Sequence, residues 1–404
     1  MIFSKYRMFG VFVVVYFLLA SSKPWLEIYL GIPHSLVTGC QLSLCFFATL
    51  FFIYKELSLN VPLFLFMIYV LARLVAELGY VYIDGRSFEE LVGAIYSAVR
   101  FIMFGGLVLL VGQYNNVESA RYLKYSLLAY FLVTCFYSLL QHPMLGNLLL
   151  LHTAGGNVVS ANGLGFFRAN GGVGGTVIAY ANFLVAVSWV IFYTKFTNKK
   201  FHLFLKLCLL ISVFLCFSRS VFIALFAMYL MSMVFDKKVR AAFVMVIITL
   251  GLVYYQAEVI VDNYTLMVSE SDTKRTGAWG AMFAGVHILE ILLGSHVGQN
   301  TGLFLGGLQK NQGGDSFLIG TVSDFGLIGV ILFVFVFTKF VFSLVGQRKS
   351  TMFGIVVSFM LIAFVNSGFE KLLVMLSYFV AIIIINNPAP QLGHSARFQK
   401  IVTR

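Results

Sequence analysis

Long apolar runs separated by short polar segments dominate the chain. Runs that approach the ~20 residues a helix needs to cross a bilayer occur at 8–22, 35–54, 61–83, 91–112, 122–140, 171–194, 201–217, 220–235, 240–257, 316–343, 351–368 and 372–387. No internal repeat and no low-complexity linker divides the chain. The pattern therefore predicts an all-α, polytopic membrane helical bundle of about twelve transmembrane helices, forming one transmembrane domain over residues 1–404.

The composition excludes a water-soluble enzyme and a disordered chain. Hydrophobic residues make up 60% of the sequence and charged residues 11%, whereas a soluble domain carries about 25% charged residues. The net charge of +12 would suggest nucleic acid as a partner of a soluble protein, but the basic residues lie between apolar runs and form no cluster interleaved with surface aromatics. We therefore expect contact with membrane lipid and no nucleic-acid partner.

Basic residues predict the orientation of the spans. With both termini in the cytoplasm, the inner segments carry about twice as many lysines and arginines as the outer ones. Lys5 and Arg7 precede an apolar run that imitates a signal peptide, but the residues after it, 21–24, form no convincing cleavage site, so we interpret the run as the first helix. Two outer, periplasmic segments are long, about 141–170 and 258–315.

Two arginines stand where apolar runs begin or end on the outer side. Arg168 lies in the glycine-rich stretch 162–175 before a helix; glycines allow close backbone approach to a ligand, and helix starts favour anions. Arg219 follows Ser218 where two short spans meet, which leaves it at or below the outer surface. Both could bind an anionic substrate. Alternatively, the glycines pack helices, Arg168 is an interfacial anchor and Arg219 reaches lipid phosphate.

The second long outer segment holds further candidates. Arg275 lies in its first third, and residues 279–293 carry apolar side chains at helical spacing, which predicts an interfacial helix that shields a site or caps the bundle. Asp315 could act as a general base or as a helix N-cap. His287 and His296 lie nine residues apart with no carboxylate at a zinc-protease spacing, and the five cysteines fall within or at the edges of apolar runs. We expect no metal and no cofactor.

Charged residues also occur inside the third and fourth spans. Arg73 and Glu77 are four residues apart, and Arg100 follows in the next span. Both arginines lie about 14 to 15 Å from the outer ends at 1.5 Å per residue. The three side chains form either a structural ion network or part of an ion or proton path, as in a transporter.

These features resemble bacterial O-antigen polymerases and the related O-antigen ligases, both in their order along the chain and in their common placement on the predicted outer side. The resemblance rests on Arg168 before a helix, Ser218-Arg219-Ser220, Arg275 in the largest outer loop, and the segments 293–298 (Leu-Gly-Ser-His-Val-Gly), 314–316 (Gly-Asp-Ser) and 325–329 (Phe-Gly-Leu-Ile-Gly). It covers residues 160–345, and the amino-terminal spans agree only in number and size.

This resemblance implies a metal-independent glycosyltransferase with a GT-C-like helical fold, a multi-pass protein of the bacterial inner membrane that acts at its periplasmic face. The donor glycan would be an oligosaccharide on undecaprenyl diphosphate, whose leaving group arginines can neutralise. Arg275 and Asp315 would then be catalytic, with Arg275 and Arg219 holding the diphosphate and Asp315 accepting the proton of the attacking hydroxyl. Arg168 and His296 would bind substrate. A chain-length regulator protein is a candidate partner.

Two other functions stay open at this point. In the ligases an outer-loop histidine usually stands near the position of Asp315, so this departure favours the polymerase, although a ligase differs only in its acceptor. A lipid-linked oligosaccharide or solute transporter, or flippase, is motivated by Arg73, Glu77 and Arg100. Transporters of this size usually consist of two related halves, and the sequence has no such halves.

Overall fold

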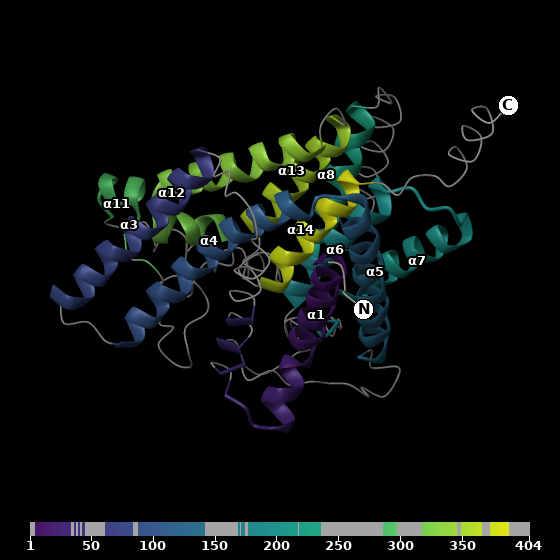
Figure 1. Cartoon of the computed structure of the whole chain (residues 1–404), viewed down its shortest axis with the longest axis horizontal. Coiled ribbons are helices and arrows are strands. Elements are labelled where there is room, and N and C mark those ends of the chain that lie inside the picture. Colours follow the sequence, from purple (N-terminus) through teal and green to yellow (C-terminus); the bar gives the residue numbers. More distant parts are fainter. Residues whose placement is uncertain are drawn as a thin grey trace, which may run out of the picture.

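A computed structural model describes residues 5–33, 36–37, 39–40, 43–44, 61–83, 88–141, 169, 171–173, 177–216, 218–235, 286–295, 297, 317–345, 349–365 and 372–387. Every regular element in this part of the chain is an α-helix, which confirms the predicted all-α class for these residues (Figure 1). The helices are α1 (Lys5–Tyr29), α3 (Val61–Ile83), α4 (Phe88–Tyr114), α5 (Val117–Leu140), α6 (Val177–Tyr193), α7 (Lys199–Cys216), α8 (Arg219–Phe235), α11 (Ile288–Leu293), α12 (Phe317–Val345), α13 (Lys349–Val365) and α14 (Leu372–Asn386).

The described helices follow the apolar runs closely. All the predicted spans except 35–54 and 240–257 coincide with one of them; the run 240–257 lies outside the described residues, and 35–54 is described only in fragments. Among the described residues, three segments are long and apolar enough to cross a membrane: Val61–Tyr80, Val117–Leu140 and Phe317–Leu344. The total of twelve spans, the orientation and the periplasmic loops stay predictions.

Local polar residues explain where several helices begin. The side chain of Asn116 accepts a hydrogen bond from the backbone N–H of Ser119 and caps α5. Asn198 caps α7 in the same way by accepting from the N–H groups of Lys200 and Phe201. Asparagine is favoured at this position because its oxygen satisfies donors that the first helical turn leaves without a partner. Both caps fall in short polar connections between apolar runs.

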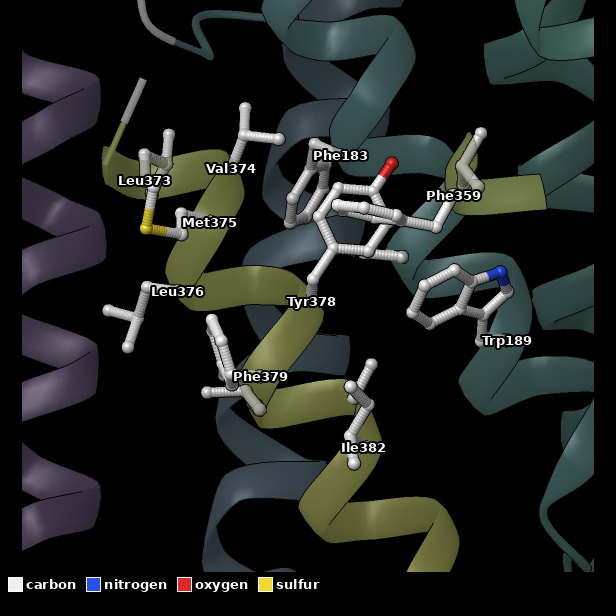
Figure 2. Packing of buried hydrophobic residues seen from close by; sticks show 14 of the residues in the cluster. Phe183, Trp189, Phe359, Leu373, Val374, Met375, Leu376, Tyr378, Phe379 and Ile382 are labelled. Carbon is white, nitrogen blue, oxygen red and sulfur yellow. The ribbon is translucent and has the colours of Figure 1, made fainter. Parts of the chain in front are cut away.

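The centre of the bundle is formed by α14 and α6, although α14 is the last helix of the described part of the chain. Both helices are buried on all sides over almost their whole length, and α14 packs against α4, α5, α6 and α12. Figure 2 shows Tyr378 of α14 between Phe183, Trp189 and Phe359. The rings of Trp189 and Tyr378 lie 4.8 Å apart between centroids, and the indole nitrogen of Trp189 donates to the hydroxyl of Ser358 at 2.8 Å.

The other helices surround this pair in two groups. On one side α3 packs against α4 and α12, and the short helix α11 packs against α12 at the end of this group (Figure 1). On the other side α1 packs against α5, and α7 packs against α5 and α6. Helix α8 packs along α13 and against α6, and α13 also packs against α12. The candidate site lies in the first group.

Candidate functional site

Three polar side chains of α3 bind the chain segment that follows α11. The hydroxyl of Tyr69 lies 3.1 Å from the carbonyl oxygen of Leu293. Arg73 donates through Nη2 to the carbonyl oxygens of Gly294, at 3.1 Å, and Ser295, at 3.3 Å. Oε2 of Glu77 accepts from the backbone N–H of Val297 at 3.2 Å. A stripe on one helix face thus binds residues more than 200 positions away in the sequence.

The partners of this stripe follow one another along the chain in the same order as the stripe does along α3. Residues four apart lie on the same face of a helix, and from Tyr69 to Glu77 the rise is about 12 Å at 1.5 Å per residue. Leu293, Gly294, Ser295 and Val297 therefore follow α3 in the same direction.

The segment 293–297 also contacts an interruption in α12. Gly326 has φ 68° and ψ 178°, which breaks the helix there. The N–H of Ser295 donates to the carbonyl of Ser323 at 2.8 Å, and the hydroxyl of Tyr69 lies 2.7 Å from the carbonyl of Phe325. Carbonyl groups near the break thus find donors on α3 and on the segment 293–297, as buried backbone groups require.

Two glycines make this contact fit. Gly294 has φ 90°, and a β-carbon on it would lie 2.5 Å from the carbonyl oxygen of Asp324. A β-carbon on Gly326 would meet the carbonyl oxygen of Leu292 and lie 2.5 Å from the nitrogen of Gly294. Both positions require glycine because the backbones touch and because positive φ is strained for residues with a side chain.

A second charged pair extends the cluster to α4. Ser97 donates its hydroxyl hydrogen to Oδ2 of Asp324 at 2.9 Å, and Nη2 of Arg100 lies 3.4 Å from the Ser97 oxygen. Ser97, Arg100 and Asp324 are all buried, with Asp324 fully inaccessible to solvent. The guanidinium and carboxylate groups therefore lie within about 6 Å of each other, where opposite charges stabilise one another in a medium of low dielectric constant.

We call this set the α3–α12 polar cluster. It consists of Tyr69, Arg73, Glu77, Ser97, Arg100, Ser295, Ser323 and Asp324. It contains two guanidinium and two carboxylate groups, whose formal charges sum to zero. Charged side chains at membrane depth are costly and therefore pair with one another or with backbone groups. Arg73 donates to backbone carbonyls and Glu77 accepts from a backbone N–H, which supports the structural interpretation of these residues over an ion path.

Aromatic side chains form an apolar layer directly beside the cluster. Phe101 follows Arg100 in α4 and packs edge-to-face on Phe325, which follows Asp324, with centroids 4.6 Å apart. Phe104 packs on Phe333 at 4.6 Å, and Phe66 of α3 contacts Phe101 and Phe104. Offset and edge-to-face aromatic pairs each stabilise a core by about 0.5 to 1.5 kcal/mol beyond burial. This layer fixes α3, α4 and α12 relative to one another.

A second contact lies where α7 ends and α8 begins. The N–H of Ala169 donates to the carbonyl of Leu215 at 2.8 Å, and Ala169 is fully buried. Leu215 is the second-last residue of α7, and Arg219 is the first residue of α8. The residue that follows Arg168 in the chain is therefore hydrogen-bonded to the last turn of α7, four residues before Arg219.

Most of the predicted site residues cannot be placed. Arg168, Arg275, His296 and Asp315 lie outside the described residues, and only the backbone position of Arg219 at the start of α8 is described. Within the described part of the chain no group of three or more His, Cys, Asp or Glu side chains could hold a metal ion.

The expected interfacial helix differs from α11. Its first half, 279–285, lies outside the described residues, and α11 covers only Ile288–Leu293. The first two residues of α11, Ile288 and Leu289, are exposed, while its last residue, Leu293, contacts Tyr69 in the middle of α3. The chain turns here because Gly294, at φ 90°, ends the helix.

Sequence analysis overlooked Tyr69 and Ser97, and gave Asp324 no role. The polar stripe Tyr69, Arg73 and Glu77 at intervals of four, in an otherwise apolar helix, could have identified the binding face of α3. Ser97 and Arg100 are three residues apart and share a face of α4 in the same way. No local pattern connects either pair with α12.

Comparison of the chain with models of known protein families and with curated protein sequences found no match.

Proposed function

We propose that this chain is a membrane glycosyltransferase of the bacterial inner membrane. It joins oligosaccharide repeat units carried on undecaprenyl diphosphate at the periplasmic face and so builds O-antigen or a related surface polysaccharide. The proposal rests on the one-sided set of Arg168, Arg219 and Arg275 next to two long outer segments in a bundle of apolar helices.

One contact carries the structural support for the proposal. The segments 293–298 and 325–329, on which the resemblance to O-antigen polymerases relies, are separated in sequence but touch through Gly294 and Gly326. The hydrogen bond between Ala169 and Leu215 likewise joins the residue after Arg168 to the helix that precedes Arg219. Two pairs of segments on which the resemblance relies are therefore in contact: Gly294 with Gly326, and Ala169 with the end of α7.

The proposed reaction is a displacement at the anomeric carbon of the donor. A hydroxyl oxygen of the acceptor glycan forms the new bond to this carbon, and the bond from the carbon to the diphosphate oxygen breaks. The diphosphate leaves with the bonding electron pair, and Arg219 and Arg275 stabilise its negative charge. Asp315 takes the proton of the attacking hydroxyl. Arg168 and His296 position the glycans.

The test is a gel of lipopolysaccharide and other surface glycans from a strain that lacks this gene. The strain is complemented with the wild-type chain or with Arg219→Ala at equal protein level. A band of core plus one repeat unit in place of the ladder, restored by wild type and not by Arg219→Ala, is the expected result. An unchanged ladder in the deletion strain would refute the proposed function.

A flippase or transporter is the second candidate, and one observation favours it. The break in α12 at Gly326, beside the buried charges of Asp324 and Arg100, matches the interrupted helices that line transporter sites. The same gel separates the two functions. Loss of every repeat unit from the core indicates a flippase or a ligase, whereas a single retained unit indicates the polymerase.

A further inference from the structure

The backbone that leaves α11 at Gly294 needs hydrogen-bond partners, and α3 supplies several of them. Backbone outside a helix leaves N–H and C=O groups without intrahelical partners, and inside a membrane protein such backbone is tolerated only where protein groups satisfy it. Arg73 supplies donors to two successive carbonyls, and Glu77 supplies an acceptor to the next described N–H. These two charged side chains therefore hold the backbone on both sides of position 296.

Burial makes these bonds strong and their loss costly. Glu77 and Val297 are both almost fully inaccessible, at 2% and 1% exposure. A hydrogen bond to a charged group is stronger than one between neutral groups, and its loss is costly where no water can replace the lost partner. Ser323 fixes the same segment from the opposite side through the N–H and hydroxyl of Ser295.

We infer that Arg73 and Glu77 are positioning residues that hold the backbone at Gly294, Ser295 and Val297. The consequence for catalysis rests on the proposed function, in which His296, between Ser295 and Val297 in the sequence, binds substrate. The pair does not touch the reacting atoms. It acts through the backbone of the segment, so its loss weakens substrate binding more than it slows the chemical step.

The first experiment measures the position of the segment without using enzyme activity. Val297→Cys is introduced into the full-length chain, and the purified protein reacts with a water-soluble maleimide. The labelled fraction is followed by mass spectrometry of the peptide that carries residue 297. In the parent the buried thiol reacts slowly. Adding Glu77→Leu or Arg73→Leu is expected to raise the labelling rate about tenfold or more, as the loss of a charged hydrogen bond predicts.

Matched variants control for charge and for shape. Glu77→Gln retains an oxygen that accepts from Val297, so it is expected to label at the parent rate. Glu118→Leu and Arg121→Leu remove the same charges from exposed positions of α5 and should also leave the rate unchanged. Equal labelling in the parent, Glu77→Leu and Arg73→Leu would overturn the inference.

The second experiment measures polymerisation by the same variants, without the cysteine, in vesicles with a lipid-linked repeat unit. Glu77→Leu is expected to raise KM for the donor about tenfold with kcat nearly unchanged, and Glu77→Gln to restore KM. Faster labelling with unchanged KM would overturn the positioning role. No polymerisation by the wild-type chain would refute the proposed function alone, because the labelling experiment does not depend on it.

Discussion

Gly294 and Gly326 pack backbone against backbone, so that a β-carbon added to either would lie within 2.8 Å of the amide nitrogen of the other. Both have positive φ, and 32 residues separate them in the sequence. This contact brings the end of α11 against the break in α12. It leaves room for the segment 293–297 to lie between α12 and the polar stripe of α3.

Gly326→Ala tests this contact. The new methyl group would collide with the carbonyl of Leu292 and strain the backbone, so we expect a loss of about 1 to 3 kcal/mol in the free energy of unfolding and a weaker polysaccharide ladder. Gly79→Ala in α3 is the control, because nothing lies within 4 Å of its added β-carbon. Thermal unfolding of the purified protein measures both. Equal melting temperatures would show that the close contact is absent.

Asp324→Ala is expected to destabilise the protein strongly. The substitution removes the buried carboxylate that accepts from Ser97, and a hydrogen bond to a charged group contributes about 1.5 to 3 kcal/mol. Ser97→Ala should cost about 1 to 3 kcal/mol, because Asp324 loses a hydrogen-bond donor.

Ser126→Ala is the control for Ser97→Ala, since the Ser126 hydroxyl bonds only to the carbonyl of Tyr122 in its own helix. Chemical denaturation in detergent compares the variants. If Ser97→Ala and Ser126→Ala have the same stability, the bond between Ser97 and Asp324 contributes nothing.

Trp189→Phe and Ser358→Ala test the packing of the central helices. The bond from the indole nitrogen to the Ser358 hydroxyl joins α6 to α13, and a buried hydrogen bond contributes about 1 kcal/mol net. A double-mutant cycle should give a coupling energy of about this size. Additive effects of the two substitutions would mean that the side chains do not interact.

Arg275→Ala tests the proposed chemistry. Loss of a charged group that stabilises the leaving diphosphate should lower the polymerisation rate about 100-fold or more. Arg275→Lys should retain part of the activity, since lysine keeps the charge but not the two parallel hydrogen bonds of a guanidinium. Arg397→Ala, in the segment predicted to be cytoplasmic, should be neutral. A normal ladder with Arg275→Ala at unchanged protein level would refute the role of this residue.

The helices themselves could be predicted because apolar runs of bilayer length leave few alternatives to an α-helix. The predicted run 61–83 coincides with α3, and the short spans around Arg219 correspond to α7 and α8. Arg73, Glu77 and Arg100 were recognised as unusual from their charge inside apolar runs. The partners of Arg73 and Glu77 were not predicted, because they are backbone groups of a segment more than 200 residues later.

Hydropathy alone cannot separate residues that face lipid from residues that face other helices, since both are apolar. The chain by itself therefore determined the membrane class, the α-helices and the unusual charges. Only the tertiary structure decided that α14 and α6 form the centre while many apolar side chains of α3 are exposed, and that the segment 293–297 lies along α3. Those choices depend on how surfaces distant in sequence fit against one another. Close packing and the pairing of buried backbone groups together select one arrangement.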